Sequence, residues 1–225
     1  MEKESVNSFY NSIAHAYENQ LTDFDTRARE EIARLFNHYV HKGIILDFGG
    51  GTGLDLPWLL TSQDRIIFVE PSSAMRAEAK KKFSHESRIS YLDERLDFTG
   101  WSEAQLPFME KADGVLVNFA VLNCIEDIGC FFERIAFVCK RNCPLVIIVI
   151  NPGFVPMTRN YSIFAAFRLL YNNKLTILNN HEGIYHETYL YTIGAIKRAS
   201  YKYFACKSVQ RVGFSNFVAI CLVKR

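Results

Sequence analysis

Short apolar runs alternate with stretches of helical periodicity over most of this 225-residue chain. Each run is brief, rich in β-branched or aromatic residues and bounded by polar residues, which is typical of a buried strand. Strands that alternate with helices predict an α/β fold, in which a mainly parallel sheet carries helices on both faces and is joined by right-handed crossovers. The five runs are residues 44–46, 66–69, 89–92, 115–117 and 146–150.

The pattern changes at both ends of the chain. Two helical stretches, 6–20 and 27–41, precede the first strand, so we expect a helical cap over residues 1–41. After the fifth strand, further helices are predicted at 163–171 and 188–199. Two apolar runs then follow with a short turn between them, which predicts an antiparallel pair and a sheet of seven strands. These last runs are residues 201–209 and 217–223.

Charge and composition exclude several classes of protein. The 26 Lys and Arg residues nearly balance the 24 Asp and Glu residues, so no overall field attracts nucleic acid or anionic lipid. The longest aliphatic run, 145–150, is far shorter than the roughly 18 residues of a membrane helix, and the first residues lack the plan of a signal peptide. The six cysteines form no CxxC pair, which favours reduced thiols and no metal site. We therefore expect one soluble, cytoplasmic domain over residues 1–225.

The first strand ends in a turn with four glycines among residues 49–53. Glycines leave backbone N–H groups uncovered at the start of the next helix, where they suit the polar groups of a ligand. The alternative is a tight strand-to-helix turn without a ligand, which a single glycine would favour and this cluster does not. A dinucleotide fold requires G-x-G-x-x-G, but counting from Gly49 puts Leu54 at the third glycine, which argues against NAD.

The second predicted strand ends in an acidic residue, Glu70, 21 residues beyond Gly49. An ionised carboxylate at this edge of a sheet accepts two hydrogen bonds from a ribose diol. Its plainer interpretation is a surface carboxylate, but the apolar residues Phe68 and Val69 directly before it favour the edge of a buried strand.

These motifs, taken in order, resemble those of the class I S-adenosylmethionine (SAM)-dependent methyltransferases. The resemblance spans at least residues 5–152 and implies a Rossmann-like sheet of seven strands whose last strand is antiparallel, which agrees with the C-terminal pattern. Its two specific motifs are the glycine turn and the segment that begins with Val69-Glu70-Pro71. The matching segments are 46–53, 69–75, 106–108, 112–117 and 121–127.

The resemblance also implies which residues contact SAM. The glycine turn borders the methionine part, Glu70 holds the ribose, and Met75 packs beside the adenine. The family often has an acid after the third strand, whereas this chain has Arg95-Leu96; the backbone N–H of Leu96 would then serve the adenine, or Asp93, Glu94 or Asp97 would supply the acid. Tyr17 would close over the cofactor, although core packing of its helix explains it equally well, and Asn118 either touches the cofactor or caps a strand. The full implied set is Tyr17, Gly49, Gly50, Gly51, Glu70, Pro71, Met75, Leu96 and Asn118.

The acceptor side carries weaker signals. His186 lies in a segment that resembles the border of the acceptor pocket in small-molecule methyltransferases, and it is the candidate general base; a surface or capping histidine is the alternative. The aromatic stretch 154–180 is predicted, as part of a helical insertion at 153–187, to cover the acceptor pocket or to form a dimer surface. The chain lacks the Pro-Pro-aromatic signature of base and amide methylation after residue Asn118.

The predicted function is therefore SAM-dependent methylation of an O or N atom of a small organic acceptor, by a monomer or homodimer. Three alternatives stay open: a methyltransferase of nucleic acid or protein, a cofactor-binding module without catalysis, and a nicotinamide oxidoreductase. A basic channel would favour the first of these. The other two differ in the nucleoside that they bind and in turnover.

Overall fold

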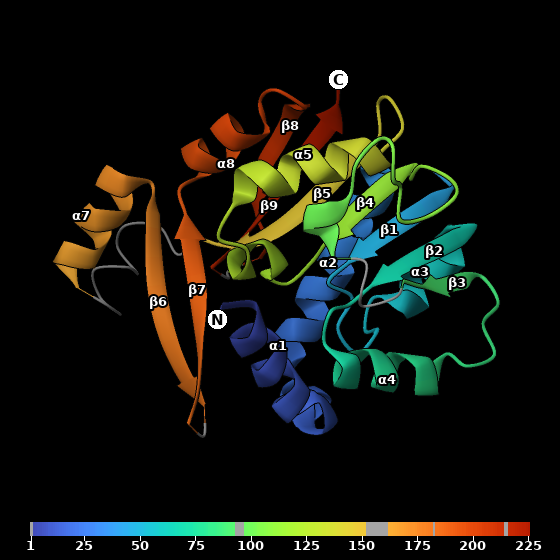
Figure 1. The fold of residues 1–225 in the computed structure, drawn as a ribbon, viewed down its shortest axis with the longest axis horizontal. Helices are drawn as coiled ribbons and strands as arrows, with labels where there is room; N and C mark the ends of the chain where they lie inside the picture. The colour runs from blue at the N-terminus through green and yellow to red at the C-terminus, as the bar shows by residue number, and fades with distance from the viewer. Residues whose placement is uncertain (1, 93–96, 152–161, 182, 214–215) are drawn as a thin grey trace.

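The computed structural model describes residues 2–92, 97–151, 162–181, 183–213 and 216–225. Its centre is a seven-stranded sheet, whose strands range in colour from blue to red in Figure 1. The strands are β1 (Ile44–Phe48), β2 (Arg65–Val69), β3 (Ile89–Tyr91), β4 (Gly114–Val117), β5 (Pro144–Ile150), β8 (Phe204–Arg211) and β9 (Phe217–Lys224). They lie in the order β3-β2-β1-β4-β5-β9-β8.

The sheet is parallel from β3 to β5 and antiparallel from β5 to β8. Ile45 of β1 pairs with Ile66 of β2 on one side and with Gly114 of β4 on the other. The C-terminal strand β9 runs antiparallel to both β5 and β8, with Val146 of β5 opposite Cys221. The predicted Rossmann-like sheet with an antiparallel C-terminal strand is confirmed.

Helices cover both faces of the sheet (Figure 1). Helices α2, α3 and α4 lie on one face, whereas α5 and α8 lie on the other. The helices are α1 (Glu2–Ile13), α2 (Asp23–Tyr39), α3 (Leu56–Ser62), α4 (Ser73–Lys82), α5 (Ile128–Val138), α7 (Ile163–Asn172) and α8 (Ile193–Ser200). Short 3-10 turns are η1 (Ala14–Gln20), η2 (Phe98–Gly100) and η3 (Val121–Cys124). Among helices of the described residues, none combines the length and apolar character needed to cross a bilayer.

The strands divide their side chains between two apolar layers, because successive residues of a strand point to opposite faces. Ile45 of β1 packs with Ile32 and Phe36 of α2, while its neighbour Leu46 packs with Phe131 of α5. All five side chains are fully buried. Both faces of the sheet are therefore closed to solvent, and the strand ends are left for a ligand.

The C-terminal third differs from the prediction. Residues 153–187 were expected to be a helical insertion, and 188–199 another helix. The described part instead contains helix α7 followed by an antiparallel hairpin of β6 (Lys174–His181) and β7 (Ile184–Tyr191), and helix α8 begins only at Ile193. The sequence of β7, Ile-Tyr-His-Glu-Thr-Tyr-Leu-Tyr, is rich in β-forming residues, and its pairing with β6 is a contact that helical periodicity cannot reveal. Residues 152–161 lie outside the described part.

Candidate active site

The site lies where the parallel strands end, beside the point at which the strand order reverses. Strand β1 has β2 on one side and β4 on the other, so the loops that follow β1 and β4 leave the sheet in opposite directions. Open α/β sheets bind ligands in the crevice that this divergence creates. Two cavities, of about 100 Å³ and about 640 Å³, lie at this edge.

The glycine turn after β1 is folded tightly against β2 and opens toward the smaller cavity. The N–H groups of Gly49 and Gly50 both donate to the carbonyl of Val69, at 2.7 and 3.1 Å. A side chain at Gly49 would collide with Val121, whereas one at Gly51, whose φ is +59°, would meet no atom within 4 Å. Close packing therefore requires the first glycine, and Gly51 leaves space for a ligand.

Glu70 closes the other side of this turn. Its carboxylate accepts hydrogen bonds from the N–H of Gly51 at 2.9 Å and from the N–H of Ser72 at 2.7 Å. The residue is only 8% exposed, and this burial raises the pKa of Glu70 to about 7, although both backbone hydrogen bonds and Arg76 act in the opposite direction. A carboxylate so placed gains from any ligand that donates hydrogen bonds to its ionised form.

Two polar atoms near the turn lack a hydrogen-bond partner within the described part of the chain. One is Oδ2 of Asp47, a residue at the end of β1 that is 1% exposed and lies beneath Gly50. Burial, followed by the charge of Asp55, raises the pKa of Asp47 well above its usual range. The other is Nε of Arg29, whose guanidinium reaches over from α2. Unpaired buried polar atoms are costly, so a donor and an acceptor left open at one site indicate a ligand with matching groups.

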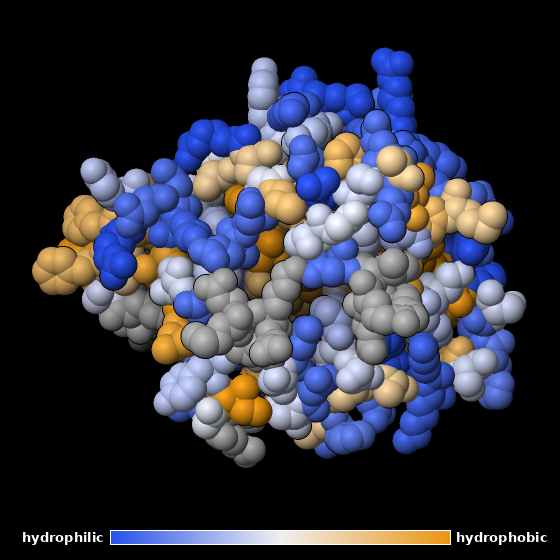
Figure 2. Space-filling model, viewed as in Figure 1, coloured by the Kyte–Doolittle hydropathy of each residue, from blue (hydrophilic) through white to orange (hydrophobic). Residues whose placement is uncertain are grey.

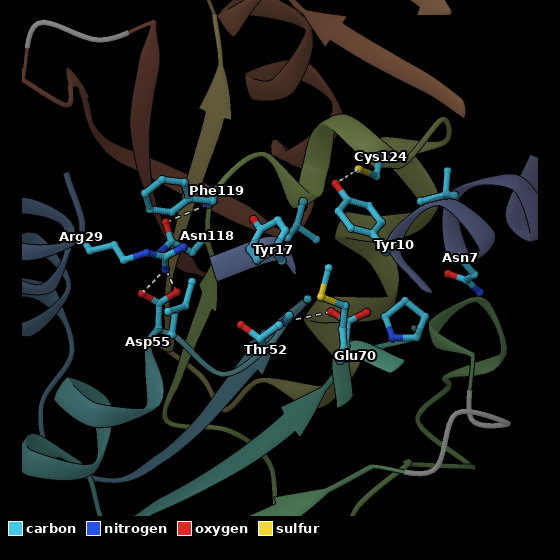
Figure 3. A pocket seen from close by; sticks show the side chains of 18 residues that line it. Asn7, Tyr10, Tyr17, Arg29, Thr52, Asp55, Glu70, Asn118, Phe119 and Cys124 are labelled. Carbon is cyan, nitrogen blue, oxygen red and sulfur yellow. Dashed lines mark hydrogen bonds and ion pairs between the residues drawn. The ribbon is translucent and has the colours of Figure 1, made fainter. Parts of the chain in front are cut away.

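Arg29 is held at the smaller cavity by a buried network (Figure 3). Its Nη1 lies 2.7 Å from Asp55, and its guanidinium lies 4.0 Å above the ring of Phe119. Asn118 donates to the second oxygen of Asp55 at 2.8 Å and accepts from the N–H of Phe119. Phe119 and Ala120 both have positive φ, a strained conformation for residues with side chains that is found mainly where surrounding contacts hold it, often at functional sites.

The N-terminal helix α1 lies beside the ends of the central strands (Figure 1), and its residues line both cavities. Its Asn11 accepts hydrogen bonds from the Ser72 hydroxyl at 2.7 Å and from the N–H of Ala74 at 3.1 Å, which ties α1 to the start of α4. The hydroxyl of the preceding residue, Tyr10, lies 3.7 Å from the Cys124 sulfur (Figure 3). Burial raises the pKa of that thiol, so Cys124 contributes a neutral wall.

The sequence of the site region matches a known family. Residues 46–145 match the family model described as a methyltransferase domain. This chain contains a methyltransferase domain. This match, together with the SAH-bound and SAM-bound methyltransferase structures of the same fold, confirms the predicted family, enzyme class and cofactor. No curated protein sequence matches the chain.

Solved structures of methyltransferases share the fold. DhpI in complex with S-adenosylhomocysteine (SAH) is 17% identical, with a TM-score of 0.71 over 98% of this chain and 96% of that chain. The 1,6-didemethyltoxoflavin-N1-methyltransferase of Burkholderia thailandensis is 15% identical, with a TM-score of 0.69 over 99% and 88%. The N-methyltransferase NodS of Bradyrhizobium japonicum is 12% identical, with a TM-score of 0.63 over 92% and 91%. At these identities the likeness shows the fold.

The methyltransferase fold gathers most of the predicted cofactor residues around one cavity. The smaller cavity is lined by all of those predicted residues that the structure describes (Figure 3), namely Tyr17, Gly49, Gly50, Gly51, Glu70, Pro71, Met75 and Asn118. Leu96 lies outside the described residues. Three lining or underlying residues, Arg29, Asp47 and Asp55, were missed. Asp47 could have been found from the sequence, because it is a charged residue inside the apolar run of β1. No sequence signal pointed to Arg29, which only the fold brings close to the turn.

The methyltransferase places His186 apart from both cavities. Its ring stacks on Phe9 of α1, with centroids 4.0 Å apart and planes 20° apart. The next residue of β7, Glu187, lines the larger cavity together with Tyr189. Adjacent strand residues point to opposite faces, so this position favours the bystander interpretation of His186, and its role as a base remains a prediction.

Replacing His186 with phenylalanine separates these two roles. The phenyl ring preserves stacking on Phe9 but has no proton to exchange, so we expect turnover to change less than about threefold. A general base contributes about 10²- to 10⁴-fold. Steady-state kinetics on wild type and variant measure the difference; a fall of 100-fold would restore His186 as the base.

The described part of the aromatic insertion does not cover either cavity. Helix α7 lies at the edge of the molecule (Figure 1), and Figure 2 shows apolar side chains gathered at that end. Phe164 is 77% exposed and Phe167 56%. Neither lines a cavity; the cover comes from α1 and β7, while the predicted contribution of residues 154–161 lies outside the described part.

Proposed function

We propose that this methyltransferase transfers the methyl group of SAM to an O or N atom of a small organic molecule. The observation that carries the proposal is the junction of the two cavities. Both reach Gly49, Glu70, Val121 and Cys124, so the cofactor residues open directly into a second space of about 640 Å³. Pockets of 300–1,000 Å³ are typical of small-molecule ligands.

The smaller cavity fits the amino-acid end of SAM. That end carries an ammonium and a carboxylate, which match the open acceptor on Asp47 and the open donor on Arg29. The uncovered backbone at Gly51 allows a close approach between them. Arg29 is also the one cation that lines this cavity among the described residues.

The ribose fits Glu70. Its carboxylate is already oriented by Gly51 and Ser72 and has lone pairs left to accept from two hydroxyl groups. Pro71 and Met75 supply apolar surface beside it. These contacts give the amino-acid end and the ribose of SAM polar partners from this chain.

Catalysis in such a site is mainly a matter of positioning. When SAM is bound, its sulfonium supplies an already activated methyl group. The chain then has to hold the acceptor in line, exclude water and, for some acceptors, remove a proton. Helix α1, held to α4 by Asn11, and strand β7 enclose the space in which this happens.

The structures that share this fold support a small acceptor. The Burkholderia thailandensis enzyme holds 1,6-didemethyltoxoflavin together with SAH. The cavity of the present chain lacks Lys, Arg or His among its described lining residues, which disfavours nucleic acid as the acceptor. The predicted cytoplasmic location and the monomeric or homodimeric state remain predictions.

Calorimetry with SAH and with NAD tests the cofactor. We expect SAH to bind and NAD to give no heat of binding, since the turn lacks the third glycine of the dinucleotide pattern. Turnover with a panel of small acceptors and labelled SAM then separates an enzyme from a binding module. Binding of NAD without SAH would overturn the proposal.

The affinity for SAH is expected to rise with pH. Ribose hydroxyls bind the ionised Glu70, whose pKa is about 7 in the free protein, so below pH 7 binding must release a proton. Affinity should therefore level off above pH 7 and be about 30-fold weaker at pH 5.5. Asp47 also contributes to the dependence of SAH affinity on pH, in the wild type and in variants alike. The measurement is therefore the difference in this pH dependence between the wild type and Glu70→Gln. The same pH dependence in both proteins would contradict the assignment to Glu70.

A further inference from the structure

The larger cavity is lined both by cofactor residues and by strand β7. Gly49 and Glu70 belong to the first group, Glu187 and Tyr189 to the second, and Glu126 lies on the segment that β7 contacts. Much of the remaining lining is apolar. It includes Phe48, Leu92, Phe98, Val121 and Ile125.

Where the structure describes the lining of this cavity, the charges on it are of one sign. Among the described residues, each charged group that lines it is a carboxylate: Glu70, Asp97, Glu126, Asp127 and Glu187. The smaller cavity differs, because Arg29 lines it. An anionic acceptor would lie close to several carboxylates and would meet no cation among the described lining residues, which is unfavourable in a partly buried space.

The carboxylates differ in what they already bind. Asp97 accepts from the N–H of Thr99 at 3.0 Å, and Asp127 caps α5 through the N–H of Cys130 at 2.9 Å. Glu126 pairs with Lys174 at 2.9 Å. Glu187 differs from these three because its partner is neither a backbone N–H nor a lysine but a neutral side chain, the Tyr189 hydroxyl, at 2.5 Å. Its negative charge therefore has no cation against it in the described contacts.

Glu187 is held at a fixed place relative to the cofactor residues. Asn123 of η3 donates to the carbonyl of Tyr189 at 2.7 Å and accepts from the N–H of Ile150 at 2.8 Å. The Tyr191 hydroxyl donates to the carbonyl of Ile125 at 2.7 Å. Strand β7 is thus tied at two points to the segment that carries Val121 and Cys124, both of which border the cofactor cavity.

We propose that the acceptor is an amine, which enters as a cation and is recognised by Glu187. This inference rests on the proposed function and adds the chemical class of the acceptor. The apolar wall receives the carbon skeleton. The carboxylate accepts hydrogen bonds from the N–H groups of the ammonium, and these hydrogen bonds are charge-assisted. Carboxylates, phosphates and other anions are excluded by the same charges.

The chemistry balances for this acceptor. The ammonium loses one proton through Glu187 to water, which leaves a lone pair on nitrogen. That pair forms the new N–C bond to the methyl carbon while the S–C bond breaks and its electron pair remains on sulfur. The products are the methylated ammonium ion, SAH and the one proton released before the transfer.

Shape-matched probes test the charge preference. Two sets are titrated into the SAH-loaded protein by calorimetry: 2-phenylethylamine with 2-phenylethanol and 3-phenylpropanoate, and hexylamine with hexan-1-ol and hexanoate. We expect each amine to bind at least about tenfold more tightly than its matched carboxylate. Glu187→Gln, which keeps the shape of the side chain, should weaken amine binding by about tenfold. Glu187→Lys should shift the preference to the carboxylates.

Glu133→Gln is the matched control. Glu133 also accepts a hydrogen bond from a tyrosine hydroxyl, that of Tyr203 at 3.0 Å, but lines neither cavity. The Glu133→Gln variant should leave probe binding unchanged. Thermal unfolding of this variant, of Glu187→Gln and of Glu187→Lys checks that each is folded. Equal binding of amines and carboxylates, no binding of either amine, or amine binding unaffected by Glu187→Gln would each overturn the acceptor class. Absence of SAH binding to the wild type, measured first, would instead refute the proposed function.

Discussion

Replacing Glu70 with glutamine is expected to weaken SAH binding by about 10- to 150-fold, the equivalent of about 1.5–3 kcal/mol for hydrogen bonds to a charged group. The carboxylate is buried and oriented by two backbone N–H groups, so a water molecule cannot readily take its place as the acceptor. Glutamine has nearly the same volume but offers one acceptor atom and no charge. Calorimetry at pH 8, where Glu70 is ionised in the wild type, gives the full effect.

The control for this variant is Glu86→Gln. Glu86 is a carboxylate that pairs with Arg88 at 2.7 Å and lines neither cavity, so its change should leave the affinity within about twofold, as is usual for a surface position. An unchanged dissociation constant for Glu70→Gln would show that the ribose is held elsewhere. A loss of folding at 25 °C in that variant, checked by circular dichroism, would assign Glu70 a structural role.

Replacing Gly51 with asparagine is expected to weaken SAH binding by about 10- to 100-fold while the fold is kept, since forcing atoms into an occupied space costs about 1–3 kcal/mol. A side chain at this position meets open space in the protein, so it occupies volume that the ligand needs. Asparagine suits the test because it tolerates the φ of +59° better than valine, which is β-branched. Calorimetry and thermal unfolding measure binding and stability separately.

Gly183 provides the matched control. It lies in the turn between β6 and β7, its φ is +86°, and a side chain there would also meet no atom within 4 Å. Gly183→Asn should therefore cause a similar loss of stability from the backbone conformation and leave the affinity for SAH unchanged. If both variants bind SAH like the wild type, the glycine turn does not hold the cofactor; if only Gly51→Asn unfolds, its glycine is needed for the turn itself.

The central strands could be predicted because the local sequence of each strand indicates its burial. Each of the runs at 44–46, 66–69 and 115–117 is apolar on both faces, as a strand covered by helices on both sides must be. The hairpin of β6 and β7 was missed because its stability comes from pairing across residues 174–191 and from docking onto η3 through Asn123. Neither contact leaves a periodic trace in the sequence.

The acceptor side shows how much one residue of strand register matters. The resemblance singled out His186, but with residues 184–191 in a strand rather than in a loop and helix, His186 faces Phe9 and Glu187 faces the cavity. The histidine has the more familiar catalytic chemistry. The direction of its side chain was decided by the strand.

The sequence by itself determined the class of fold, the glycine turn and the acidic residue after β2, because a buried strand, a positive φ and a sheet-edge carboxylate each impose a requirement on neighbouring residues that composition and spacing reveal. Only the tertiary structure brought Arg29 to Asp55 and Asp47 beneath Gly50. It also decided that Glu187, and not His186, lines the larger cavity. The reason is physical: these positions follow from the packing of α2 against the sheet and of β7 against η3, and packing between distant segments depends on shapes and partners that no local pattern specifies.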